Sequence, residues 1–269
     1  MTCLGCPMLT TLYVARHAHR MNANHFGGGN VIPRDPPLTA RGEEQTGELS
    51  SFFASLPAEE QPQWIVCSPY TRCLRTAMPV AECLHIPVGV EPGLAEWFAP
   101  AFPQDTGVHP SPRTGEHVVD EFPTISLAWT PLLYPDPHGE TIPALHERMR
   151  EVMRRIEKRC AAWGIERVLL VSHAASIIAL GRMIQTIASY EDVREMPIRA
   201  GTASVSKYTR AGNVWHQEYN GATSFLLHGE ERAWDFSFVP DNNTEPGMGP
   251  DWHDPFTPSD DSLVFRAKL

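Results

Sequence analysis

The sequence lacks an excess of positive charge. Its 269 residues include 22 Lys and Arg against 32 Asp and Glu, which gives a formal net charge of -10 at pH 7. A protein that binds nucleic acid through a broad surface needs an excess of basic side chains facing the phosphates. The charge balance therefore argues against direct nucleic-acid binding. It does not exclude a small pocket with positive charge.

Long apolar runs and a secretory signal are missing as well. No stretch approaches the roughly 20 apolar residues that cross a bilayer, and the first residues lack a basic start followed by an apolar core. We expect no membrane association and a location in the cytosol or the nucleus. Cys3 and Cys6 form the one close cysteine pair, and no second pair completes a tetrahedral zinc site.

Short apolar runs alternate with helical patterns along the chain. Runs typical of strands buried on both faces of a parallel sheet occupy residues 12–15, 64–67, 87–90 and 167–172. Apolar residues with helical spacing occupy residues 38–56, 70–84, 139–163 and 174–187. Residues 202–208 and 214–219 alternate around a short turn, which predicts an antiparallel hairpin at the sheet edge. These patterns predict an α/β fold with a mostly parallel sheet.

Two segments fall outside this alternation. Residues 99–137 are rich in proline and aromatic residues and are too long for an ordinary connection, so we expect a lid or a substrate wall. Residues 240–269 are rich in proline, aspartate and asparagine, which predicts an extended or disordered tail. The expected domain therefore covers residues 1–239.

Basic side chains cluster where predicted strands end. Arg16, His17, His19 and Arg20 follow the first strand, and His173 follows the strand at 167–172. Ligands of open α/β sheets bind at the carboxyl edge, and a guanidinium binds phosphate oxygens as a bidentate fork. These residues predict an anion site.

Two further residues extend this site. Arg72 opens the helix after the second strand, beside the amide donors of the helix start, although a surface arginine is the plain alternative. Glu96 lies beside Trp97 after the third strand, and an apolar setting would raise its pKa as a general acid requires. Taken alone, Glu96 is more typical of a solvated loop residue.

A metal centre is a weaker alternative. His17, His19 and His173 could act as three ligands. However, Arg16 and Arg20 would repel a divalent cation at this position, and no clear carboxylate ligand follows. We therefore expect no metal and no cofactor.

The ordered motifs resemble the histidine phosphatase superfamily. They are Arg16-His17-Ala18-His19-Arg20, Ser68-Pro69-Tyr70-Thr71-Arg72, Glu96 and Ser172-His173. The resemblance implies a three-layer α/β/α sandwich of the phosphoglycerate mutase-like kind and metal-independent hydrolysis of a phosphomonoester, such as phosphotyrosine or an aryl phosphate.

The resemblance also implies a role for each site residue. His17 would carry the phosphoryl group, Glu96 would act as acid and base, and His173 would complete the catalytic set. The phosphate would be bound by Arg16, Arg20, Arg72 and His173. Candidates for contact with the rest of the substrate are His19, Asn22 and Trp97.

A narrower resemblance suggests an alternative function. Residues 171–181, 199–208 and 220–235 are similar to the phosphatase-like domain of the fungal tau subunit of transcription factor IIIC, of the tau55 kind. This likeness implies a weakly active or inactive scaffold with protein partners in RNA polymerase III transcription. Ala18 and Ala174 stand where the superfamily usually has glycine, and a positive φ at either position would strain the site.

Overall fold

The computed structural model describes residues 8–21, 35–100, 111–185 and 197–236. Strands and helices alternate within them. The elements are β1 (Thr11–Arg16), α1 (Ala40–Ser55), β2 (Trp64–Cys67), α2 (Thr71–Leu84), β3 (Val88–Val90), the 3-10 turn η2 (Pro92–Leu94), α3 (Gly115–Val118), α4 (Ile142–Trp163), β4 (Arg167–Ser172), α5 (Ala174–Ile184), β5 (Val205–Ala211) and β6 (Val214–Ala222).

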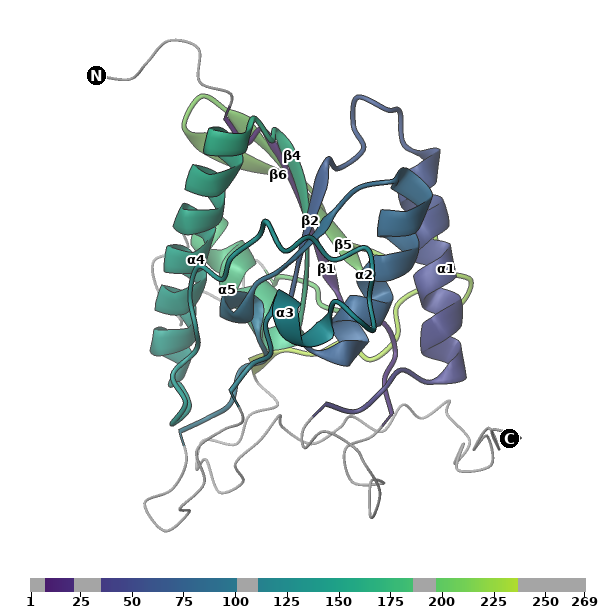
Figure 1. The fold of residues 1–269 in the computed structure, drawn as a ribbon. Helices are drawn as coiled ribbons and strands as arrows, with labels where there is room; N and C mark the ends of the chain where they lie inside the picture. Colours follow the sequence, from purple (N-terminus) through teal and green to yellow (C-terminus); the bar gives the residue numbers. More distant parts are fainter. Residues whose placement is uncertain (1–7, 22–34, 101–110, 186–196, 237–269) are drawn as a thin grey trace.

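The strands form one six-stranded sheet in the order β3-β2-β4-β1-β5-β6. The pairs among β3, β2, β4 and β1 are parallel, whereas β5 pairs antiparallel with both β1 and β6. Helices α4 and α5 cover one face of the sheet, and α1 and α2 cover the other (Figure 1). The predicted three-layer sandwich with an antiparallel edge is confirmed.

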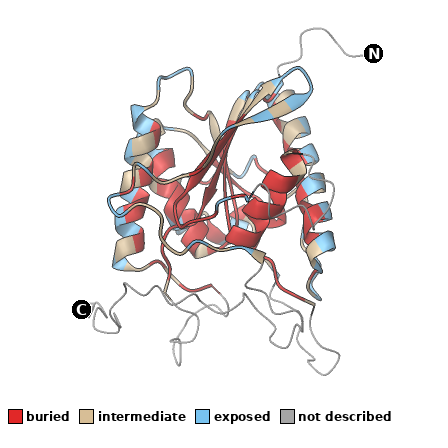
Figure 2. Ribbon diagram, turned by 180° about the vertical axis from the view of Figure 1, so that it is seen from behind, coloured by how far each residue is buried: buried red, intermediate tan, exposed pale blue. Residues whose placement is uncertain are grey.

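Alternating strand residues build a core on each face. In β4, Val168 and Leu170 pack with α4 and α5, while Leu169 and Val171 pack with α1 and α2. Helices α1, α2 and α4 bury their inner faces and expose residues on their outer faces, whereas every residue of α5 except Met183 is buried (Figure 2). Burying such a side chain stabilises the folded protein by about 1.5–3 kcal/mol. Because helices cover both faces of the sheet, successive strand residues are all buried, which explains the continuous apolar runs of the sequence.

Several predicted boundaries differ from the structure by two or three residues, and two of them have a clear local cause. The helix expected from residue 139 begins at Ile142, because the Thr141 hydroxyl caps it by accepting the Ala144 N–H at 3.3 Å. The strand expected from residue 202 begins at Val205, because Ala203 has a φ of 53° and interrupts the extended backbone.

The segment 99–137 is more than a lid. Phe122 and Trp129 are buried in the cores, and Ile125 bridges to Val88 at the β3 edge. The Glu91 carboxylate fixes the following stretch by accepting the Trp129 indole N–H at 3.1 Å and the Leu132 N–H at 2.9 Å. Most of its described part therefore closes one side of the sheet, which the sequence patterns did not predict.

Several predictions concern residues outside the described ranges. Asn22, the Cys3 and Cys6 pair and the predicted tail 240–269 are among them. Across the ranges that the structure does describe, no helix combines the length and apolar character needed to cross a membrane.

Substitution of Gly89 tests the packing of the sheet edge, and substitution of Gly47 in α1 serves as a comparison. A Cβ on Gly89 in β3 would lie 2.4 Å from the buried Trp129 ring, so Gly89→Ala should destabilise the fold by about 1–3 kcal/mol. Gly47 lies inside α1, and a Cβ added there would meet nothing within 4 Å, so Gly47→Ala should stabilise the fold by about 0.5–1 kcal/mol. Urea denaturation followed by circular dichroism measures both, and an unchanged midpoint for Gly89→Ala would contradict this packing.

Candidate active site

The predicted functional side chains meet at the carboxyl ends of neighbouring parallel strands. β1 and β4 end at the same level, which brings the His17 and His173 rings to a centroid distance of 5.4 Å. β2 flanks β4 on its other side and leads into α2 with Arg72. Glu96 follows η2, and its Oε2 lies 3.3 Å from Arg72 Nη2 and 3.3 Å from His173 Nδ1. Separate stretches of sequence thus converge on one cluster.

His17 is fixed as a neutral imidazole of defined tautomer. Its backbone N–H donates to the Ser172 carbonyl at 2.9 Å. Its Nδ1 lies 2.8 Å from the Ala18 carbonyl oxygen, which can only accept, so Nδ1 carries the proton. Burial, followed by the charges of Arg72 and Arg16, lowers the pKa of His17 well below its usual value. At neutral pH Nε2 therefore keeps the lone pair that makes a histidine nucleophilic.

His173 is held from both ring nitrogens. Arg72 Nη2 lies 3.1 Å from Nδ1, and the Ser68 hydroxyl oxygen lies 2.7 Å from Nε2. Glu96 Oε2 also lies 3.3 Å from Nδ1, so this nitrogen has both a donor and an acceptor beside it, and the Ser68 hydroxyl can either accept from Nε2 or donate to it. Burial is the main reason that the pKa of His173 is lowered to about 4. The sequence motif contained Ser68, but only the structure gives it the role of orienting His173.

Arg72 is completely buried and carries much of the charge of the site. Asp35 Oδ1 lies 3.2 Å from Arg72 Nη1, while Asp35 Oδ2 accepts the Thr71 N–H at 2.9 Å and pairs with Arg113 at 3.2 Å. The Arg72 guanidinium also lies 4.5 Å from the centre of the Tyr70 ring. Sequence reasoning missed Asp35, since it lies among prolines with no periodic pattern, and only its contact with α2 reveals it.

The expected raised pKa of Glu96 is wrong for this arrangement. Burial does raise it, but His173, Arg72 and the Trp97 N–H together outweigh burial and lower the pKa of Glu96 to about 2. The carboxylate is therefore ionised at neutral pH. Its negative charge balances part of the positive charge of the neighbouring guanidinium.

The loop that carries Glu96 is fixed by buried hydrogen bonds. Arg148 of α4 donates to the carbonyls of Gly93 at 2.8 Å and Ala95 at 3.0 Å. Its Nε donates to Glu140 at 2.7 Å, which keeps the buried charge paired. The Ser176 hydroxyl donates to the Ala95 carbonyl at 3.0 Å from α5. The position of Glu96 is thus set by two helices that follow it in the sequence.

The two arginines beside His17 are both buried. Arg16 Nη1 donates to the carbonyls of Ala200 and Arg232, each at 2.6 Å. Arg16 Nε is buried with no hydrogen-bond partner among the residues described. Burial, with the charge of Arg20 next, lowers the pKa of Arg16 to about 9, so it stays charged at neutral pH. Arg20 Nη1 donates to the Met21 carbonyl at 2.8 Å.

Residues 230–236, here called the C-terminal strap, position these arginines. Arg232 has a φ of 47°, and its backbone carbonyl accepts from Arg16 while its Nη1 donates to the Arg20 carbonyl at 2.8 Å. Phe236 anchors the end of the strap, with its ring 4.9 Å from the Arg182 guanidinium. The resemblance of residues 220–235 to the tau subunit included most of the strap, but its hydrogen bonds to Arg16 and Arg20 could not be predicted, because they join residues far apart in the chain.

The three candidates for substrate contact have different surroundings. His19 is buried, and its Nδ1 lies 2.8 Å from the hydroxyl of Thr39, the residue that caps α1. The Trp97 indole packs in the core and donates to the Glu140 carbonyl at 2.7 Å. Asn22 lies outside the described residues. Contact of all three with a substrate stays a prediction.

Neither alanine in the place of a usual glycine strains the backbone. The non-glycine residues with positive φ in the described ranges are His85, Ala203 and Arg232, so Ala18 and Ala174 are not among them. Ala18 donates its N–H to the Thr76 hydroxyl at 2.9 Å. The expected strain is absent, and these alanines give no structural reason for slow turnover.

A metal could in principle use a different ligand set from the predicted one. One ligand atom each of His17, Glu96 and His173 lies within 4.8 Å of the others, whereas His19 is not part of this group. The buried Arg72 guanidinium contacts both Glu96 and His173, and its charge opposes a divalent cation there. The donor set fits an anion better than a metal ion.

The buried histidines should make stability depend on pH. His17 and His173 have lower pKa values in the folded protein than the roughly 6.5 of an unfolded chain. Below pH 6.5 the unfolded state therefore binds more protons, and stability falls from about pH 6.5 towards pH 4. The slope should reach about 1.4 kcal/mol per pH unit for each such histidine.

Urea denaturation at several pH values between about 7.5 and 4.5 measures this slope. His173→Gln should reduce it, and His216→Gln, at an exposed position of β6, is the matched control. The same slope in His173→Gln and in the unsubstituted protein would show that His173 is not held neutral.

The sequence comparisons agree with the motifs. The sequence model of the histidine phosphatase superfamily (branch 1) matches residues 12–221. The transcription factor tau 55 kDa subunit of Saccharomyces cerevisiae is 32% identical over 269 residues, which covers 86% of this chain and 60% of that protein. The chain thus spans less than two thirds of that relative's length.

Solved structures share the fold at lower identity. The ecdysone phosphate phosphatase from Bombix mori, in complex with tungstate, aligns with a TM-score of 0.61 and 16% identity over 79% of this chain and 93% of its own. A mycobacterial glucosyl-3-phosphoglycerate phosphatase aligns with a TM-score of 0.54 and 20% identity over 79% of this chain and 98% of its own. With its ordered motifs joined in one buried cluster and the family match over residues 12–221, the chain belongs to the histidine phosphatase superfamily, branch 1.

Proposed function

We propose that this chain is a phosphomonoester hydrolase that acts through a phosphohistidine at His17, on phosphotyrosine or other aryl phosphates. The observation that carries the proposal is the state of His17. Its Nδ1 proton is committed to the Ala18 carbonyl, and the ring stays neutral beside buried arginines. A neutral nitrogen next to fixed positive charge suits attack on a phosphate ester.

In the first step, His17 Nε2 forms a bond to phosphorus while the ester P–O bond breaks. The Nδ1–H bond to Ala18 stabilises the positive charge that develops on the ring. Arg16, Arg20, Arg72 and His173 would surround the equatorial oxygens of the transferring group. Because these donors are already ordered in a buried site, little reorganisation is needed as charge shifts in the transition state.

The buried Arg16 Nε supports a bound anion independently. It has no hydrogen-bond partner among the described residues. A buried donor left unsatisfied costs about 1–3 kcal/mol. A phosphate oxygen at this position would offset that cost, which a neutral substrate group would do less well.

Glu96 would move the proton that the leaving group needs. Without ligand, its carboxylate is paired with Arg72 and His173. A phosphate dianion would take over these partners and add a like charge beside Glu96, and both effects raise the pKa of the carboxyl group. The protonated acid then donates to the leaving oxygen. The resulting carboxylate takes a proton from the water that attacks phosphohistidine, which releases phosphate and restores His17.

His17→Ala should reduce hydrolysis of 4-nitrophenyl phosphate by at least about 10³-fold, because the residue that accepts the phosphoryl group is removed. Rapid mixing with a ³²P-labelled aryl phosphate and acid quench should label the unsubstituted protein with an acid-labile phosphate and leave His17→Ala unlabelled. A chelator in the assay tests the expectation that no metal takes part.

The control for this experiment is His216→Ala, which removes an exposed histidine of β6 and should keep full activity. Circular dichroism checks that both variants are folded. Undiminished hydrolysis by His17→Ala would reject the proposal, and loss of activity with the chelator would favour a metal centre instead.

A second candidate is a scaffold of low or no activity with protein partners in RNA polymerase III transcription and a nuclear location. Its support is the 32% identity with the transcription factor tau 55 kDa subunit. The net charge of -10 favours protein partners over direct contact with nucleic acid.

The two candidates predict opposite results for the purified chain. The scaffold predicts no acid-labile label on His17 with any phosphate ester tested, together with recovery of transcription factor IIIC subunits with the tagged protein from cells of the source organism. A His17→Ala protein should then recover the same subunits. Labelling of His17 by an aryl phosphate would exclude an inert scaffold.

A further inference from the structure

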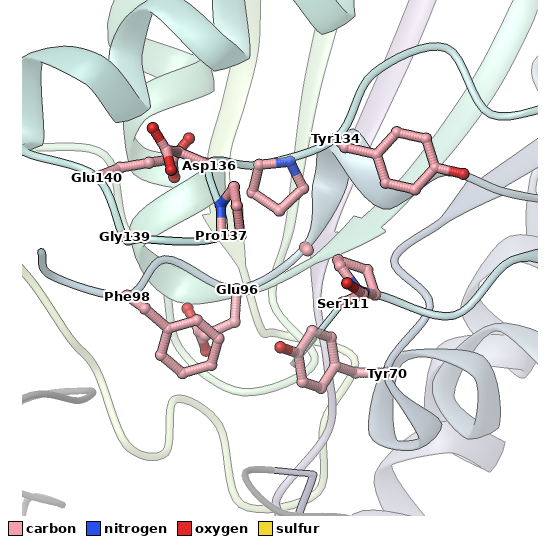
Figure 3. A pocket seen from close by; sticks show the side chains of 12 residues that line it. Tyr70, Glu96, Phe98, Ser111, Tyr134, Asp136, Pro137, Gly139 and Glu140 are labelled. Atoms are coloured by element: carbon pink, nitrogen blue, oxygen red, sulfur yellow. The ribbon is translucent and has the colours of Figure 1, made fainter. Parts of the chain in front are cut away.

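A pocket lies directly beside Glu96. Its volume is about 240 Å³. The Tyr70 and Phe98 side chains lie along one side, and the chain from Tyr134 to Glu140 lies along the other (Figure 3). Half of the residues that line the pocket are aromatic residues or prolines, which suit a flat apolar group.

The pocket is joined to the reacting centre through two of its lining residues. Glu96 lines it and also lies 3.3 Å from both Arg72 and His173. The Tyr70 ring lines it and stands edge-on to His173 at 5.1 Å. In the proposed reaction Glu96 protonates the leaving oxygen, so the group that occupies this pocket is the one that departs.

The charge of the lining residues is negative. The ionisable lining groups include the carboxyls of Glu96, Asp136 and Glu140, and among the described residues that line the pocket there is no Lys, Arg or His. Glu140 is compensated by Arg148 at 2.7 Å. Asp136 is 59% exposed, and its Oδ1 accepts the His138 N–H at 2.8 Å and lies 3.2 Å from His138 Nδ1, so among the described residues this lining carboxylate has no arginine partner.

We propose that this pocket is the leaving-group subsite and that it selects a flat apolar group with positive charge beside it, as in a phosphotyrosine followed by a basic residue. A leaving group with a second anion is disfavoured. The inference rests on the proposed hydrolase function and adds the charge preference, with Asp136 as a specificity-determining residue.

Two phosphotyrosine peptides that differ only by Lys or Glu after the phosphorylated residue test the subsite. Their leaving oxygens have nearly the same intrinsic reactivity, so the ratio of kcat/KM reports the pocket. At low ionic strength the full chain should favour the Lys peptide by about 5-fold, and this preference should shrink at about 0.5 M salt. Asp136→Lys should abolish or reverse it.

Asp120→Lys is the matched control, because Asp120 is exposed and is not among the residues that line the pocket. It makes the same change in net charge and should leave the preference intact. Equal rates for the two peptides, or a preference that survives Asp136→Lys, would overturn the subsite. If neither peptide is hydrolysed while 4-nitrophenyl phosphate still is, the proposed subsite is wrong and the proposed hydrolase activity is kept. If no phosphate ester is hydrolysed and His17 is not labelled, the proposed hydrolase activity is itself refuted.

Discussion

A completely buried guanidinium is the constraint on which the site depends. Arg72 lies within 3.3 Å of carboxylate oxygens of Asp35 and Glu96 and of a ring nitrogen of His173. A charge removed from water is tolerated only when it is paired and hydrogen-bonded. The loop before α1, the loop after η2 and the start of α5 must therefore come to the same place, and the alignment of the parallel strands allows them to do so.

The same constraint keeps the reacting groups ready. Positive charge and burial act in one direction on His17 and His173, and both stay neutral at neutral pH. They act in opposite directions on Glu96, where the contacts with His173, the charge of Arg72 and the Trp97 N–H outweigh burial and lower the pKa. Without a ligand, the Glu96 carboxylate is held against Arg72. The position proposed for the phosphate is therefore already surrounded by hydrogen-bond donors. In the proposed reaction, binding of the phosphate would exchange one anion for another instead of creating a new arrangement.

The elements around the site serve mainly to hold it in place. Arg148 and Ser176 fix the loop that carries Glu96, and the C-terminal strap supplies a carbonyl to Arg16. The contact between Arg16 and Arg232 connects the last described residues to the first strand. The pocket beside Glu96 is formed partly by the segment that also closes the sheet edge, so the proposed leaving-group subsite and the stability of the fold depend on the same stretch of chain.

Much of this protein was determined by the sequence itself. Apolar runs covered on both faces set the strands, and their polar ends identified His17, His173 and Arg72, since local patterns of burial and charge suffice for both. The tertiary structure alone decided the roles of Asp35, Ser68 and Arg232, the ionised state of Glu96 and the unstrained backbone at Ala18. These depend on contacts between residues far apart in the chain, and a pKa or a backbone angle follows from the neighbours that folding supplies and not from the residue's own place in the sequence.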